Sequence, residues 1–112
     1  MTKIVSIDCN KITNEESLHS VFSEAFGFPD YYGNNMDAWI DCMSSLDEES
    51  GMSEFKLEKD EALILKLENA SKFIKEHNNL YQIIFECSSF VNYRRVEQGD
   101  KAILAIMISE NL

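Results

Sequence analysis

Two carboxylates one helical turn apart, Asp37 and Asp41, are the side chains of this sequence best placed to do chemistry. Paired carboxylates can act as general acid and general base, or they can present negative charge to a basic partner. Folding alone does not require both, because like charges at positions i and i+4 destabilise a helix by about 0.2–0.5 kcal/mol. The plain alternative is that both are ordinary solvated acids in an acidic protein.

The residues around these carboxylates predict a helix that turns both of them away from the core. At about 100° per residue, Asp37 and Asp41 fall on a flank roughly opposite a set of apolar residues at helical spacing, Met36, Trp39, Ile40 and Met43. The turn before this helix contains Tyr31 and Tyr32, and we expect at least one of them in the core. Gly33 is expected either to adopt a positive φ or to let the backbone of a partner approach closely.

The composition limits the partners of these acids. The 112 residues include 10 Lys and Arg against 20 Asp and Glu, which gives a formal net charge of −10. This charge argues against direct binding of nucleic acid, since phosphate contacts need clustered basic residues, so the partner should be positive. With 45% hydrophobic residues, the chain is expected to fold as one domain over residues 1–112.

The chain lacks the usual signals for membranes, secretion, metals and cofactors. Its longest apolar run, 102–108, is far shorter than the roughly 20 residues of a membrane span, and its first residues do not resemble a signal peptide, so we expect a cytoplasmic protein. Three widely spaced cysteines indicate reduced thiols. Neither a glycine-rich phosphate loop nor paired metal ligands are found, and the sequence predicts no cofactor, no metal and no catalytic residue.

Hydrophobic periodicity predicts helices and strands in alternation. In chain order they are a strand at 4–7, a helix at 14–26, a helix at 36–46, a strand at 62–67, a short helix broken near 77–79, a helix at 80–91 and a strand at 102–108. The first helix should begin at a capping box formed by Thr13 and Glu16, and Asn69 or Ser71 should cap the third. Residues 47–60 are expected to be a solvated connection with one amphipathic turn. The last strand, the most apolar segment, is placed at the centre of a parallel sheet.

The segment from Leu18 to Met43 resembles the signature of the barstar family, small acidic intracellular inhibitors of barnase-type ribonucleases. The resemblance rests on Leu18-His19 and on the string P-D-Y-Y-G-N-N-M-D-A-W-I-D-C-M, which begins at Pro29. It implies an α/β fold of barstar type, a small three-stranded parallel sheet packed with about four helices in the order β-α-α-β-α-α-β. It also implies a bacterial immunity protein of a toxin–antitoxin pair, which binds a basic toxic ribonuclease one to one and is itself no enzyme.

The same resemblance implies a role for each matching residue. Asp41 would be the carboxylate that takes the place of the substrate phosphate in the ribonuclease active site. The other implied partner-binding residues lie in the loop before the second helix, at the start of that helix or along it: Tyr31, Gly33, Asn34, Asn35, Asp37 and Ile40.

Two departures from the family pattern concern the partner. Trp39-Ile40 stands where the family usually has Leu-Trp, so an aromatic that often borders the interface has changed places with a core position. Arg94, with Arg95 beside it, stands where family members carry an acidic contact residue, and both would repel a basic ribonuclease. The alternative functions are therefore a module of the same fold for a toxin that is not a ribonuclease or for another basic protein, and an enzyme that uses Asp37 and Asp41.

Overall fold

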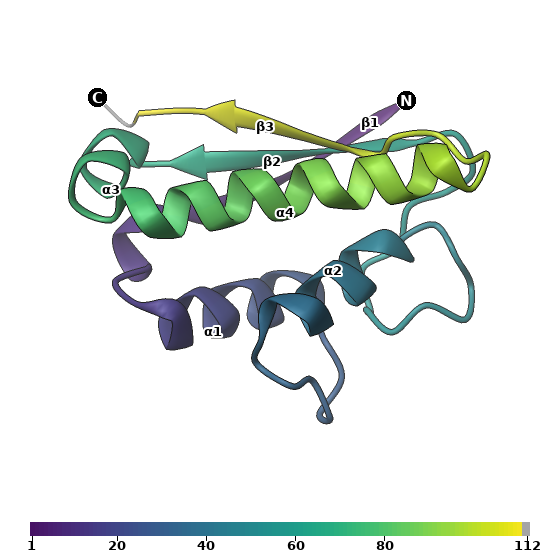
Figure 1. Ribbon diagram of the computed structural model, residues 1–112, viewed down its shortest axis with the longest axis horizontal. Helices are drawn as coiled ribbons and strands as arrows, with labels where there is room; N and C mark the ends of the chain where they lie inside the picture. The colour runs from purple at the N-terminus through teal and green to yellow at the C-terminus, as the bar shows by residue number, and fades with distance from the viewer. Residues whose placement is uncertain (111–112) are drawn as a thin grey trace.

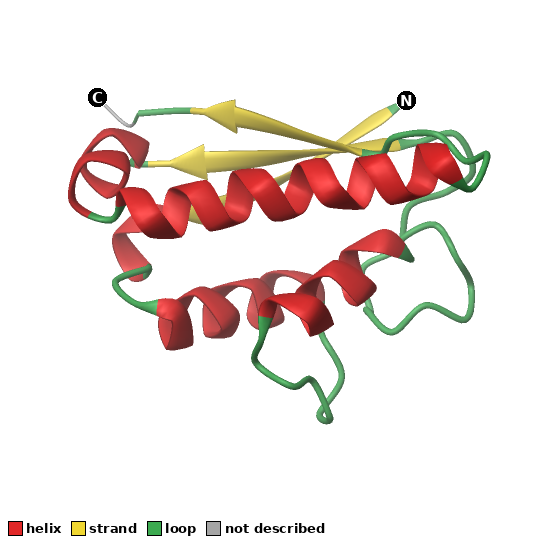
Figure 2. Cartoon of the chain, in the orientation of Figure 1, coloured by secondary structure: helices red, strands yellow, loops and turns green. Residues whose placement is uncertain are grey.

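The computed structural model describes residues 1–110 and confirms the predicted order of strands and helices. In chain order the elements are β1 (Thr2–Asp8), a 3-10 turn at Cys9–Lys11, α1 (Glu15–Phe26), α2 (Met36–Ser44), β2 (Ala62–Glu68), α3 (Ala70–Glu76), α4 (Asn78–Glu97) and β3 (Leu104–Ile108). The three strands form one parallel sheet (Figures 1 and 2). The α/β class and the three-stranded parallel sheet are therefore as expected.

The central strand of the sheet is β2, so the expectation that the last strand is central was wrong. The strand order is β1-β2-β3, and Leu65 of β2 pairs with Val5 on one side and Ile106 on the other. The inward side chains of β2, among them Leu65, are fully buried, whereas Met107 and Ile108 of β3 are 38% and 46% exposed. An apolar run shows only that a strand has a buried face; it does not report how many neighbours the strand has.

The helices form a layer beside the sheet and place α2 on its outer side. Figure 1 shows α4 lying along the sheet, with α1 and α2 further from it. The ring of Trp39 in α2 meets Phe22 of α1 edge to face, with 5.5 Å between ring centroids, and both side chains are fully buried. α2 also packs against α4. One side of α2 is therefore fixed in the core and the opposite side remains free.

The caps that fix α1 differ by one residue from those predicted. Asn14 caps the helix by accepting a 2.7 Å hydrogen bond from the Ser17 amide, and the Ser17 hydroxyl accepts one of 3.1 Å from the Asn14 amide. The box is thus formed by Asn14 and Ser17 instead of Thr13 and Glu16. Gly27 ends the helix with φ of 65°, a left-handed conformation that glycine adopts without strain.

The connection at 47–60 is docked on the protein, in contrast to the solvated segment that the sequence suggests. The amides of Glu54 and Phe55 donate to the carbonyls of Gly27 and Phe26, at 2.9 and 3.0 Å, and Leu57 is buried. Phe55 also stacks edge to face on Phe26. The polar composition of residues 47–60 does not predict this docking, because backbone hydrogen bonds do not depend on the type of side chain.

Two features of the described residues bear on function. Within residues 1–110, no helix combines the length and the apolar character that crossing a membrane requires. The three cysteines are free thiols, and two of them, Cys9 and Cys42, are buried.

Candidate protein-binding surface at the start of α2

The loop before α2 is held in one conformation by its own polar groups. The side-chain oxygen of Asn35 caps α2 by accepting a 2.8 Å hydrogen bond from the Ala38 amide, and its amide group donates to the Gly33 carbonyl at 3.2 Å. Asn34 adopts a left-handed conformation with φ of 51°. Of the two expectations for Gly33, the positive φ was wrong, because its neighbour Asn34 makes the turn, and the close approach of a partner backbone stays a prediction. A side chain at Gly33 would approach the Asn35 amide nitrogen to 2.9 Å.

The two tyrosines of the loop have opposite environments. The hydroxyl of Tyr32 lies 2.5 Å from Nδ1 of His19, a buried histidine of α1, and the Tyr32 ring contacts Phe28 with 4.6 Å between centroids. Burial raises the pKa of the Tyr32 hydroxyl, which therefore stays protonated at neutral pH. Tyr31, in contrast, is 75% exposed. Tyr32 anchors the loop and Tyr31 is free for contact with a partner.

The carboxylates of α2 point outward as predicted. Ile40, which the resemblance placed among the partner-binding residues, points into the core. Asp37 and Asp41 are exposed, and the Asp41 side chain is 58% exposed. Ile40 is only 8% exposed and belongs to the core, as does Trp39. Both side chains lie on the apolar face of the helix, so neither offers a partner a large contact.

Tyr31, Gly33 and Asp41 meet around one small hollow of about 80 Å³. Pockets for small molecules usually measure about 300–1,000 Å³, so this hollow suits a single side chain of a partner better than a free ligand. Its remaining lining comes from the loop, from α2 and from the docked connection: Pro29, Tyr32, Ala38, Cys42 and Met52. Met52 was not predicted here, because no periodicity or motif in the sequence connects it with this loop.

Cys42 beside this hollow lacks the properties of a nucleophile. Burial raises the pKa of its thiol, and the negative charge of Asp41 raises it further. A thiol acts as a nucleophile only as the thiolate, which a raised pKa suppresses. The arrangement thus offers a carboxylate and an aromatic ring on a preorganised scaffold, without an activated group beside them.

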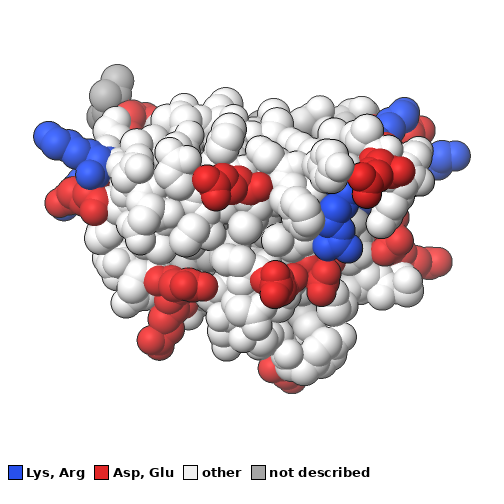
Figure 3. Space-filling model, in the orientation of Figure 1, with Lys and Arg blue, Asp and Glu red and all other residues white. Residues whose placement is uncertain are grey.

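Figure 3 shows acidic side chains gathered over α1 and α2 on this face, with a basic group among them where α2 and α4 meet. The ion pair at this position joins Nη1 of Arg94 in α4 to Oδ1 of Asp41, at 3.6 Å. Arg94 therefore lies at the surface, as expected, but its charge is paired with Asp41, the carboxylate that the resemblance implies as the phosphate mimic.

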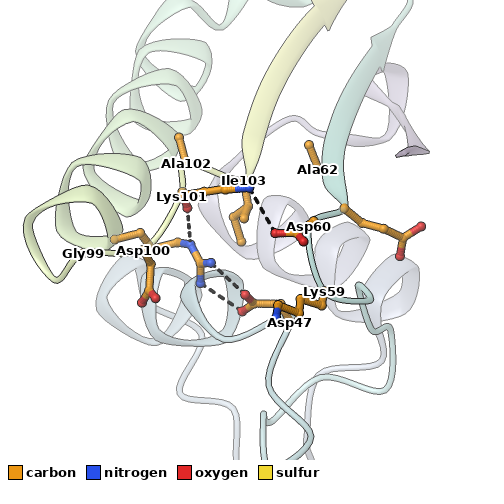
Figure 4. Close-up of a pocket in the computed structure, with 11 residues that line it drawn as sticks. Asp47, Lys59, Asp60, Ala62, Gly99, Asp100, Lys101, Ala102 and Ile103 are labelled. Atoms are coloured by element: carbon orange, nitrogen blue, oxygen red, sulfur yellow. Dashed lines mark hydrogen bonds and ion pairs between the residues drawn. The ribbon is translucent and has the colours of Figure 1, made fainter.

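Arg95, expected beside Arg94 at the interface, is instead buried. It is 6% exposed and borders a cavity of about 410 Å³ at the amino ends of β2 and β3 (Figure 4). Its guanidinium donates to both carboxylate oxygens of Asp47, at 2.9 and 2.7 Å, and to the carbonyls of Ser44 and Lys101, each at 2.8 Å. Arg95 thus ties the end of α2 to α4, and its charge is satisfied internally.

Two further acids of this cavity, Asp60 and Glu61, form ion pairs, with Lys101 and Lys3 respectively. Lys101 lies 3.1 Å from Asp60, and the contact lowers the pKa of the Asp60 carboxyl. Among residues 1–110, no group of three or more His, Cys, Asp and Glu side chains is arranged to hold a metal ion.

Comparison with known proteins identifies a family and a curated relative. Residues 2–105 match the family described as "Barstar (barnase inhibitor)". A protein of Bacillus subtilis (strain 168) named "Putative ribonuclease inhibitor YrdF" is 46% identical over 44 residues, which are 39% of this chain and 47% of that protein. The chain thus matches about half the length of this curated relative.

Proposed function

The chain belongs to the barstar family, and from this premise we propose that it inhibits a toxic ribonuclease of the barnase type by occluding its active site. Members of this family act as inhibitors of another protein. The finer proposal concerns the mechanism, in which Asp41 enters the place that the substrate phosphate occupies. The observation that carries it is the convergence of Asp41, Tyr31 and Gly33 on one side-chain-sized hollow.

A carboxylate on a rigid helix is a suitable substitute for a phosphate. A ribonuclease active site is built from basic groups that bind an anion, and these groups form charge-assisted hydrogen bonds with a carboxylate as they do with a phosphate. The fixed cap at Asn35 and the buried Trp39 hold α2 in place, so little conformational freedom is lost when Asp41 is bound. Tyr31 would cover the side chain that enters the hollow.

The charge of the chain supports rapid association with such a partner. A net charge of −10 attracts a basic cleft over long range, an effect known from the barnase–barstar pair itself. We propose a one-to-one complex that buries on the order of 1,600 Å² in total, the usual size of a specific interface. The complex would protect a cell that holds the inhibitor in its cytoplasm from the toxin.

A titration of the chain into a barnase activity assay tests this function. The unmodified chain should inhibit stoichiometrically. Asp41→Ala should weaken the complex at least about thirtyfold, because truncation of one partner of a buried ion pair costs about 2–5 kcal/mol. Tyr31→Ala and Asn35→Ala should weaken it less.

The matched control for Asp41→Ala is Glu48→Ala, which removes the same charge from an exposed position on the connection between α2 and β2. It should lower mainly the association rate, and more so at low salt. Equal affinities for Asp41→Ala and the unmodified chain would refute the phosphate-mimic role. Failure to inhibit barnase, both by the unmodified chain and by a variant without the positive charge of Arg94, would favour the alternative, a module of the same fold for another basic toxin.

A further inference from the structure

Asp41 already has a cationic partner in the isolated chain. Nη1 of Arg94 lies 3.6 Å from Oδ1 of Asp41, and the two side chains are 39% and 58% exposed. Within residues 1–110, Asp41 forms no other ion pair. The carboxylate proposed to enter an active site is therefore neutralised in part before any partner arrives.

The position of Arg94 is fixed by a second contact. Its guanidinium carbon lies 5.8 Å from the centre of the Phe90 ring, one turn earlier on α4, within the range of a cation–π interaction. The contact with Phe90 lies within α4, and the ion pair with Asp41 joins α4 to α2, against which it packs. Phe90 itself is 46% exposed. The arginine is thus held at the surface beside Asp41, in contrast to Arg95, which is buried against Asp47.

We propose that Arg94 is a specificity-determining residue, an internal counter-ion that a partner must displace from Asp41. This inference rests on the proposed function, since it concerns the same carboxylate. A toxin that binds Asp41 through a basic group brings a second cation to the place where Arg94 lies, and like charges in contact are unfavourable. The arrangement thus disfavours a toxin whose surface is basic throughout and selects one with an acidic side chain beside the basic group, ready to receive Arg94.

Barnase, whose cleft binds the phosphates of RNA, is a suitable probe for this penalty. Arg94→Gln should tighten the complex with barnase by about threefold to tenfold at low salt, because the change frees Asp41 and removes a like charge. Arg94→Lys should bind as the unmodified chain does, because the charge is retained. The gain should shrink at moderate salt, since exposed charges are screened.

A change of net charge alone also affects binding to a basic protein, so a control with the same charge is needed. Lys72→Gln provides it: Lys72 lies on α3, its side chain is 78% exposed, and it pairs with Glu76. Both substitutions change the formal charge from −10 to −11, but only one of them is beside Asp41. The difference in affinity for barnase between Arg94→Gln and Lys72→Gln measures the effect of the charge beside Asp41, separate from that of net charge.

The ion pair can also be tested without a partner. Three-bond NMR couplings report the rotamers of the Asp41 side chain about χ1. In the unmodified chain one rotamer should dominate, and Arg94→Gln should average the couplings, whereas Arg94→Lys should restore much of the preference. Unchanged couplings in Arg94→Gln would show that Arg94 does not hold Asp41, and would overturn the internal counter-ion.

The binding outcomes separate this inference from the proposed function. If the unmodified chain inhibits barnase and Arg94→Gln binds no more tightly than Lys72→Gln, the role of Arg94 is refuted and the inhibitor function stands. If Arg94→Gln inhibits barnase but the unmodified chain does not, the selective role of Arg94 is supported in its strongest form. If no variant inhibits barnase, the proposed function and the selective role are refuted together.

Discussion

Replacement of Arg95 by methionine should destabilise the fold far more than the same replacement of Arg94. Methionine keeps much of the apolar stem of arginine, so the loss is mainly electrostatic. Arg95 is 6% exposed and donates to Asp47 and to the carbonyls of Ser44 and Lys101. Arg95→Met leaves these three acceptors without their donor at the junction between α2 and α4.

Removal of one partner of a buried ion pair costs about 3–5 kcal/mol. The Asp47 side chain retains 26% exposure and can be partly rehydrated, which favours the lower end of that range. We therefore expect Arg95→Met to cost about 3 kcal/mol, a large part of the 5–15 kcal/mol that stabilises a typical domain. Arg94→Met removes an exposed pair and should cost no more than about 1 kcal/mol.

Urea unfolding followed by the fluorescence of Trp39, the single and fully buried tryptophan, measures both values. With an m value of about 1.5 kcal/mol/M, Arg95→Met should lower the midpoint by roughly 2 M. Asp47→Asn should cost less, and in the double variant the two costs should not add, because both changes break the same contact. Equal midpoints for Arg95→Met and Arg94→Met would refute the assignment of Arg95 to a structural role.

Two further predictions concern stability. Gly27→Ala should lower the free energy of unfolding by more than about 1 kcal/mol, since a Cβ at φ of 65° would lie 2.6 Å from Glu54. Gly99→Ala, at φ of 88° but with open space around it, should lower it clearly less, as thermal unfolding would show. Equal losses would contradict the steric clash at Gly27. Burial raises the pKa of the Cys9 thiol in the folded protein to about 12, whereas the thiol of the unfolded chain ionises near pH 8.5. The stability that the neutral thiol contributes should therefore be lost as the pH rises from about 9 towards 12. Urea unfolding at pH 8, 9 and 10 should show this fall, and it should be smaller in Cys9→Ala; identical pH dependence in the two proteins would count against the buried thiol.

Local periodicity was enough to predict the order of elements and the outward direction of the α2 carboxylates. Apolar residues at helical spacing define a buried face without reference to the rest of the chain, so Asp37 and Asp41 fall on the opposite side. The position of a strand within the sheet, which depends on the strands beside it, was harder to predict. The place of β3 at the edge of the sheet follows from the strand order, which the hydrophobicity of residues 102–108 does not encode.

The local structure of the candidate surface could be predicted from the sequence, whereas contacts between distant residues could not. The loop before α2 and the cap at Asn35 lie within a few residues of each other, so the sequence pattern contains them. Arg95 follows Val91 by four residues and so lies on the buried face of α4, but it was misplaced because its partner, Asp47, lies 48 positions away. Met52 reaches the hollow only because the connection docks on α1.

Competition between this chain and a nucleoside monophosphate for barnase tests the central claim most directly. If Asp41 occupies the phosphate site, a nucleotide bound there should reduce the apparent affinity of the chain by the factor 1 + [L]/Kd, where [L] and Kd belong to the nucleotide. Ionic strength is kept constant by chloride, so that screening does not imitate competition. An affinity unchanged at saturating nucleotide would show that the chain binds elsewhere on the ribonuclease, and would contradict the account.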